Sequence, residues 1–333
     1  MRPKALIICE HAHFNDIYGP EELAALGAML DFAVPYQDRE SVERNPEILR
    51  DVEVILGSWG MPVLNETFLA HAPVLKAVFY ASGTVKNFVT DAFWDRGLIL
   101  SGANSVFVTP VAEFTVSQII FCLKHGWQFI LDVKRNRTFR HDRLLTGPGC
   151  FHTTVGLISM GATARHVLEK LRAFDFHVIA YDPFLTNDEA HEMGITLRSL
   201  DEVFAEADVV SLHSPNLPET RAMIKGHHFE MMKQGASFIN TARGAIIDEP
   251  AMIKVLQERT DIVAVLDVTF PEPPPTDSPL YDMDNVILTP HIAGVMGPEC
   301  RRGSQMVAQE VRRWLAGEPL CGSFTKELLS RSA

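Results

Sequence analysis

Short apolar segments alternate with longer amphipathic segments along most of the chain. Segments of this kind that are expected to form buried strands lie at residues 4–9, 52–58, 75–81, 153–159, 177–182, 208–213, 236–242, 262–268 and 285–291. Short strands that are apolar on both faces, with helical segments between them, are typical of a parallel sheet covered on both sides. The pattern therefore predicts a doubly wound α/β architecture.

The strand candidates form two groups, which predicts two such sheets. The first group ends before about residue 100, and the second runs from about 153 to 290. Between them lies a strongly apolar helical segment, in which Thr109 can cap the helix and Pro110 suits the first turn. A helix this apolar is expected to be buried, either in a domain interface or against another subunit.

The last helical segment, residues 306–319, follows no strand of its own. We expect it to return to the first sheet, so that residues 1–104 and 295–333 form one discontinuous domain and residues 105–294 form the other. Val307, Val311, Trp314 and Leu315 fall on one face of this helix. Gly317 and then Pro319 are expected to end it.

Composition and charge exclude several classes of protein. The 333 residues are 47% hydrophobic and 22% charged, which allows a large buried core. The net charge of −12 argues against nucleic acid or an anionic membrane surface as a partner. The five cysteines are odd in number and show no C-x-x-C spacing, which favours reduced thiols in the cytoplasm over disulfides or a cysteine metal site. We find no apolar run of about 18 residues and expect no membrane span.

The segment VGLISMGATARHV, residues 155–167, has the strand–turn–helix form of a dinucleotide-binding turn. Of the three glycines of G-x-G-x-x-G, Gly161 keeps the middle position, where backbone approaches a pyrophosphate, and Ala164 is an accepted third residue. Ser159 replaces the first glycine, and serine disfavours a positive φ. Asp182 ends the next strand, where a carboxylate accepts hydrogen bonds from ribose hydroxyls and favours NAD over NADP. The alternative is an ordinary βαβ turn with a surface aspartate.

Three polar residues follow later strands, where ligands of doubly wound sheets gather. Arg243 can hold a substrate carboxylate with its planar guanidinium group, and His291 can move a proton to or from a hydroxyl. Glu272 can orient the imidazole and favour its protonated form. Each of these residues alone is more often a structural or solvated side chain, so the prediction depends on their joint placement after the nucleotide-type turn.

The order of the segments GLISMGATAR, AYDP, INTARGAIIDE, LDVTFPEP and TPHIAG is similar to that in the D-isomer-specific 2-hydroxyacid dehydrogenases. The resemblance covers nearly the whole chain. It implies a Rossmann-type NAD domain, a discontinuous flavodoxin-like substrate domain, and a homodimer built partly on the long inter-domain helix. It also implies that Arg243, Glu272 and His291 are the catalytic residues.

The resemblance assigns further residues to ligands. The substrate carboxylate would lie against the loop of Ser82, Gly83 and Thr84, together with Arg243, although Lys86 departs from the family pattern there. Asp267 would face the nicotinamide carboxamide. The full set of implied cofactor contacts is Ser159, Gly161, Ala162, Thr163, Asp182, Ser214, Thr241, Ala242, Asp267, His291 and Gly294. No metal site is implied.

The sequence thus predicts an NAD-dependent enzyme that transfers a hydride between the cofactor and a small D-2-hydroxy or 2-oxo acid. Two alternatives remain open. The same fold can serve a dinucleotide-responsive binding or corepressor protein without physiological turnover. A related enzyme could also act on a substrate without a carboxylate, which would leave Arg243 without its natural partner.

Overall fold

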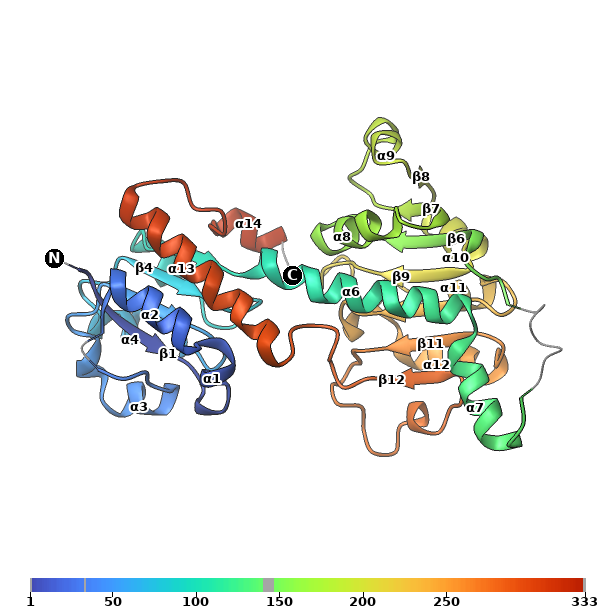
Figure 1. The fold of residues 1–333 in the computed structure, drawn as a ribbon, viewed down its shortest axis with the longest axis horizontal. Helices are drawn as coiled ribbons and strands as arrows, with labels where there is room; N and C mark the ends of the chain where they lie inside the picture. Colours follow the sequence, from blue (N-terminus) through green and yellow to red (C-terminus); the bar gives the residue numbers. More distant parts are fainter. Residues whose placement is uncertain (1, 33, 140–146, 332–333) are drawn as a thin grey trace. The chain divides into compact units, whose positions relative to one another are not determined.

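The computed structural model describes residues 2–32, 34–139 and 147–331, and it contains two compact units, each built on one parallel sheet (Figure 1). The first unit comprises residues 1–107 and 295–333, and the second comprises residues 108–294. Both sheets carry helices on their two faces, so the predicted doubly wound α/β class is confirmed.

The sheet of the first unit has five parallel strands in the order β2-β1-β3-β4-β5. This is the flavodoxin-like order, in which the chain reverses direction across the sheet beside the first strand. The strands are β1 (Lys4–Ile8), β2 (Asp31–Phe32), β3 (Val54–Gly57), β4 (Ala77–Tyr80) and β5 (Ile99–Gly102).

Alternate residues of these strands face opposite layers of helices. Leu6 and Ile8 pack under α3, α4 and α5, while Ala5 and Ile7 pack under α1, α2 and α13. The helices of the first unit are α1 (Phe14–Ile17), α2 (Pro20–Met29), α3 (Arg39–Arg44), α4 (Glu66–His71), α5 (Asp91–Asp95), α13 (Arg301–Ala316) and α14 (Lys326–Arg331).

The last long helix, α13, lies beside α1 and α2 of the first unit, as the sequence analysis expected (Figure 1). Val307 and Val311 are buried there, and Gly317 ends the helix with a φ of 71°. Leu315, which was predicted on the same helical face, is 44% exposed. The residue falls in the last turn of the helix.

The second unit has seven parallel strands in the order β12-β11-β10-β9-β6-β7-β8. Counted from β6, this is the Rossmann order with one added strand, and the chain changes direction between β6 and β9. The strands are β6 (Phe151–Ile158), β7 (Asp175–Tyr181), β8 (Thr196–Leu197), β9 (Val209–Leu212), β10 (Ser237–Asn240), β11 (Val263–Leu266) and β12 (Val286–Leu288).

Two layers of helices cover this sheet. Val155 and Leu157 of β6 face the layer of α6, α8 and α9, while Ile158 faces the layer of α10, α11 and α12. The helices are α6 (Asn104–Leu123), α7 (Gly126–Asn136), α8 (Ala162–Leu171), α9 (Asn187–Met193), α10 (Leu200–Glu206), α11 (Gly226–Met231) and α12 (Glu249–Glu258).

Helix α6 departs from two expectations. It begins at Asn104, so Pro110 lies inside the helix and the predicted start at Thr109 was wrong. By length and composition alone, this 20-residue helix could cross a membrane. About a third of its apolar stretch is buried within the structure. Ala112, Val116 and Ile119 of this helix belong to the core of the second unit.

Every predicted strand segment coincides with an observed strand, but the sequence analysis missed β2, β5 and β8. β2 and β8 have two residues each, which is too short for an apolar pattern to stand out. β5 has the sequence ILSG, in which only Ile99 and Leu100 have large apolar side chains.

Candidate active site

The turn after β6 keeps the backbone shape that a glycine would give it. Ser159 has a φ of 69°, in the left-handed region that L residues other than glycine, asparagine and aspartate rarely adopt. Its amide donates to the carbonyl of Tyr181, at 2.7 Å, and its hydroxyl shares a 2.6 Å hydrogen bond with the hydroxyl of Ser214. These bonds from neighbouring strands hold Ser159 in the unfavourable conformation.

Gly161 stands directly before α8 and leaves room for a ligand. A Cβ placed on Gly161 would meet no atom within 4 Å, so the space before the first turn of α8 is open. The amide groups at the start of a helix bind anions such as a pyrophosphate. Ala162 begins the helix and is exposed, Thr163 is half-buried, and the side chain of Ala164 is buried in the core. The turn therefore fits a dinucleotide.

Asp182 follows β7 and lies across the turn. One carboxylate oxygen accepts a hydrogen bond from the amide of Met160 at 2.7 Å, and the other accepts from the amide of Phe184 at 2.8 Å. Asp182 thus fixes the turn and its own loop, and its half-buried carboxylate retains capacity for further donors. Ribose hydroxyls are donors of the kind that this position would accept.

Arg243 lies in a tight turn after β10. The hydroxyl of Thr241 shares a 3.0 Å hydrogen bond with Thr115 of α6, and the Nη1 of Arg243 donates to the carbonyl of Ala242 at 2.6 Å. Gly244 lies so close to the backbone of Thr269 that an added Cβ would be 2.0 Å from the Thr269 carbonyl carbon. Only glycine fits at this position, so the turn after Arg243 is fixed against the segment that leads to Glu272.

His291 and Glu272 form a hydrogen-bonded pair. The Nδ1 of His291 lies 2.6 Å from a carboxylate oxygen of Glu272, and both side chains are about half exposed. An ionised carboxylate only accepts, so we assign the Nδ1 proton to His291. The Nε2 on the opposite side of the ring is then the atom that can gain or lose a proton.

Asp267 holds the loop that carries His291. Its side chain is 2% exposed, and it accepts hydrogen bonds from the hydroxyl of Thr289 at 2.6 Å and from the amides of Ile292 and Ala293 at 2.8 and 2.9 Å. The His291 amide also donates to the Asp267 carbonyl at 3.0 Å, and His291 has a φ of 55°. The carboxylate expected to face nicotinamide thus has a structural role that the sequence did not reveal.

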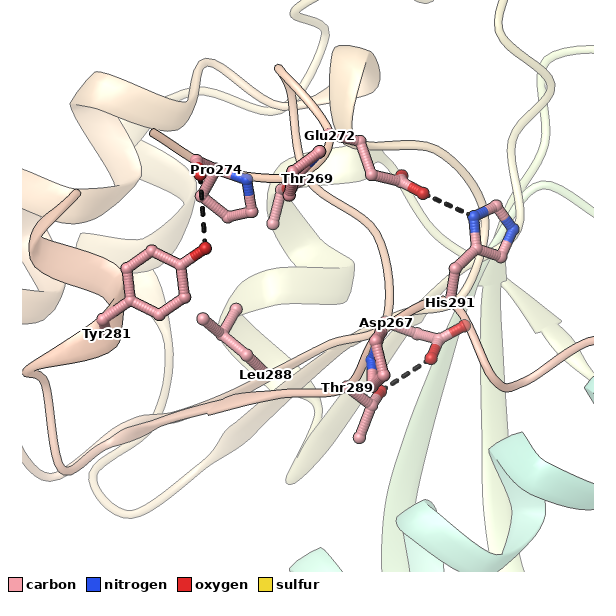
Figure 2. Close-up of a pocket in the computed structure, with 10 residues that line it drawn as sticks. Asp267, Thr269, Glu272, Pro274, Tyr281, Leu288, Thr289 and His291 are labelled. Carbon is pink, nitrogen blue, oxygen red and sulfur yellow. Dashed lines mark hydrogen bonds and ion pairs between the residues drawn. The ribbon is translucent and has the colours of Figure 1, made fainter. Parts of the chain in front are cut away.

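A cavity of about 430 Å³ lies beside this pair. Figure 2 shows Glu272 and His291 on one side of it and Tyr281 with Pro274 on the other, where the Tyr281 hydroxyl donates to the Pro274 carbonyl at 3.2 Å. Leu288 lies between them. The sequence analysis named Glu272 and His291 but not Pro274, Tyr281 or Leu288, which form the other part of this wall.

The loop expected to bind a substrate carboxylate belongs to the first unit, directly after β4. Ser82 is buried, Gly83 has open space where a Cβ would stand, and the Thr84 hydroxyl accepts a hydrogen bond from the Lys86 amide at 3.4 Å. Gly294 is the last residue of the second unit and is half-buried.

One cluster in the second unit has the residue types of a metal site. Ligand atoms of Asp201, His227 and His228 lie within 4.8 Å of one another. The Nδ1 of His228 accepts a hydrogen bond from the amide of Lys225 at 2.8 Å, so the neutral ring carries its proton on Nε2, 3.2 Å from Asp201. Burial lowers the pKa of His228 and favours this neutral ring. No lone pair remains at Nε2 for a metal, so hydrogen bonding explains the cluster.

Comparison with known proteins places these features in a family. Residues 116–293 match the family model of the NAD-binding domain of D-isomer-specific 2-hydroxyacid dehydrogenases. D-3-phosphoglycerate dehydrogenase of Methanocaldococcus jannaschii is 31% identical over 82% of this chain, and that of Mycobacterium leprae is 33% identical over 75%. The matches cover 51% and 47% of those two proteins, so the chain spans about half the length of these relatives.

Solved structures share the fold. A phosphoglycerate oxidoreductase from Rhizobium etli aligns with a TM-score of 0.82 at 21% identity, over 99% of this chain and 100% of that one. D-mandelate dehydrogenase of Rhodotorula graminis aligns with a TM-score of 0.81 at 21% identity, over 98% of both chains. The family match covers more than half of the chain and assigns NAD as the cofactor of the second unit. This chain therefore belongs to the D-isomer-specific 2-hydroxyacid dehydrogenase family.

Proposed function

We propose that the protein transfers a hydride between NAD(H) and a small D-2-hydroxy or 2-oxo acid. The observation that carries this proposal is the 2.6 Å hydrogen bond between His291 and Glu272, which presents an imidazole Nε2 for proton transfer. Bound NADH supplies the hydride, and the oxidised cofactor accepts it in the reverse direction. In reduction, protonated His291 gives its Nε2 proton to the substrate oxygen, and Glu272 stabilises the protonated ring.

We propose that the second unit binds the cofactor and the first unit contributes to substrate binding. Arg243 would hold the substrate carboxylate and polarise the carbonyl, with the backbone amides of Ser82, Gly83 and Thr84 as further donors. The cofactor would lie along the carboxyl edge of the second sheet, where the open space at Gly161 and the carboxylate of Asp182 support binding. The other proposed cofactor contacts are Ser159, Ala162, Thr163, Ser214, Thr241, Ala242, Asp267, His291 and Gly294.

We also propose that the protein is a cytoplasmic homodimer. Helix α7 has no fully buried residue, and three large apolar residues of this part of the chain are exposed: Ile130 on α7, Phe139 after it in the sequence, and Phe151 at the start of β6. A second copy of the chain would cover such a surface. Light scattering should give twice the monomer mass, and Ile130→Asp with Phe151→Asp should give the monomer mass. Phe184→Asp, which changes an exposed residue elsewhere, should leave the dimer intact.

A panel of small 2-oxo acids assayed with NADH and NADPH tests the reaction. We expect NADH oxidation with at least one acid, and a loss of roughly 100-fold or more in kcat for His291→Gln, because general acid–base catalysis contributes 10²–10⁴-fold. NADH binding by this variant should stay close to wild type. His227→Gln, an exposed histidine of the same unit outside the site, is the matched control.

Undiminished turnover by His291→Gln would refute the role of this residue. NADH binding without turnover of any acid would instead favour the dinucleotide-responsive binding or corepressor protein. Turnover only of carbonyl compounds that lack a carboxylate, added to the same assay, would favour the related enzyme with a non-carboxylate substrate.

A further inference from the structure

Asn240, the last residue of β10, has no role in the function proposed so far, yet it lies under the turn that carries Arg243. Its side chain is 0% exposed. Its Oδ1 accepts a hydrogen bond from the Ala242 amide at 3.0 Å, and its Nδ2 donates to the Arg243 carbonyl at 3.2 Å. One side chain thus binds the backbone on both sides of the peptide bond that joins Ala242 to Arg243.

We propose that Asn240 is a positioning residue that sets the direction of the Arg243 side chain toward the substrate carboxylate. This inference rests on the function proposed above. The turn is already restrained at its ends, by Thr241 bonded to Thr115 and by Gly244 packed against Thr269. The backbone torsions of Ala242 and Arg243 lie between these two restraints, and the Asn240 amide fixes them.

Asn240 also connects the arginine to the histidine. Its backbone carbonyl accepts a hydrogen bond at 3.0 Å from the amide of Asp267, the residue directly after the neighbouring strand β11. Asp267 holds the loop of His291 through its carboxylate and its carbonyl. Side-chain bonds from Asn240 and Asp267 therefore support Arg243 and His291 separately, on adjacent strands that are joined at this point.

The chemistry of the site requires an amide. Aspartate could accept from the Ala242 amide, but it has no proton for the Arg243 carbonyl and would place a negative charge against that oxygen. Alanine would remove both bonds, so that the Ala242 amide loses its partner and the Arg243 carbonyl keeps only the 3.5 Å hydrogen bond from the Ile246 amide. Both substitutions free the Arg243 backbone, and a displacement of about 1 Å in a substrate-positioning group can cost about 100-fold in rate.

Asn240→Asp and Asn240→Ala should each raise the KM for the 2-oxo acid by roughly tenfold or more, while the KM for NADH changes less than about twofold. The dissociation constant of oxamate, an unreactive 2-oxo acid analogue, should rise in parallel when measured on the protein–NADH complex. In an Arg243→Ala background, Asn240→Ala should change the oxamate affinity by less than about twofold, because its effect passes through Arg243.

Asn285→Ala is the matched control for loss of a buried amide. Asn285 is also buried, and its Nδ2 donates to the carbonyls of Leu256 and Ile262, away from Arg243. We expect a similar loss of thermal stability in both alanine variants, and a weaker oxamate affinity only in Asn240→Ala. Equal weakening of oxamate by Asn285→Ala, or the same loss from Asn240→Ala with and without Arg243, would overturn the inference.

The same measurements separate this inference from the proposed function. A wild-type protein that binds oxamate but reduces no 2-oxo acid would contradict the dehydrogenase activity, and the oxamate series would still decide the role of Asn240. A wild-type protein that neither reduces any 2-oxo acid nor binds oxamate in the presence of NADH would overturn both.

Discussion

Two turns of the second unit solve the same backbone problem in different surroundings. Ser159 and His291 both have a positive φ without being glycine, 69° and 55°. In each case a carboxylate from another segment accepts an amide proton directly after that residue, Asp182 from Met160 and Asp267 from Ile292. A carboxylate that accepts backbone amides offsets part of the cost of a left-handed residue, which is about 1–2 kcal/mol.

The two turns differ in the burial of the carboxylate and in the hydrogen-bonding groups that remain available to a ligand. Asp267 is buried, and it accepts three hydrogen bonds from the His291 loop. Asp182 is half-buried and accepts two. The first arrangement fixes one side chain, His291, in a defined direction. The second leaves open backbone at Gly161 and spare acceptor capacity at Asp182, as a ligand-binding turn requires.

Replacing the buried carboxylate of Asp267 should have the largest effect on activity and stability. In Asp267→Asn one oxygen becomes an amide that cannot accept, so at least one of Thr289, Ile292 and Ala293 loses its partner. We expect kcat to fall about 100-fold, or about 2.7 kcal/mol, through displacement of His291. Unfolding stability should fall by roughly 1–3 kcal/mol. Steady-state kinetics and urea denaturation measure the two effects. Wild-type kcat in a folded Asp267→Asn protein would show that the loop needs no such support.

A histidine that follows the strand next to the Ser159 turn is half-buried, and its titration predicts a dependence of stability on pH. His213 follows β9, its amide donates to the Ile158 carbonyl, and its buried Nε2 has no partner among the described residues. Burial lowers the pKa of His213 to about 4, from 6.5 for an unperturbed ring. The unfolded chain takes up a proton as the pH falls through 6.5, whereas the folded protein takes it up only near 4. Stability is therefore complete above 6.5 and falls between 6.5 and 4.

At pH 5 the loss should be about 2 kcal/mol, 1.5 pH units multiplied by 1.36 kcal/mol. Urea denaturation at pH 7.5 and pH 5 measures it, and His213→Asn should have a smaller difference between the two pH values. A wild-type protein with equal stability at both values would contradict the burial of a neutral ring at this position.

The sequence was sufficient for the elements with a strong local pattern. Apolar segments such as those of β1 and β6 predicted the two parallel sheets, and the strand ends indicated Arg243, Glu272 and His291 as candidate residues. The start of α6 was misplaced because Pro110 favours a first turn locally, whereas the helix continues through it. Asn240 was overlooked because a polar residue that ends an apolar strand looks like any turn residue. Its hydrogen bonds form only when the turn folds back over it.

Removing the half-buried carboxylate should have a smaller effect than breaking Asp267. Asp182→Ala loses the bonds to Met160 and Phe184 and the proposed bonds to the ribose. We expect the KM for NADH to rise roughly tenfold, or about 1.4 kcal/mol, with kcat nearly unchanged, because the loss lies in cofactor binding. NADPH should gain relative to NADH, since the charge that repels a 2′-phosphate is removed. Asp188→Asn, an exposed carboxylate on α9, is the control. An unchanged ratio of NADH to NADPH use in Asp182→Ala would place the ribose elsewhere.

The smallest effect should come from returning Ser159 to glycine. Ser159→Gly removes the strain of the left-handed residue, about 1–2 kcal/mol, but it also removes the hydrogen bond to Ser214 and makes the unfolded chain more flexible. These changes nearly cancel, so we expect stability within about 1 kcal/mol of wild type and a KM for NADH within about threefold. Ser159→Ala keeps the strain and loses the bond, so it should be less stable than Ser159→Gly by roughly 1 kcal/mol. Thermal melting of the three proteins side by side gives the order. If Ser159→Ala were the more stable variant, strain would not be the cost that the Ser214 bond offsets, and the parallel between the Ser159 and His291 turns would fail.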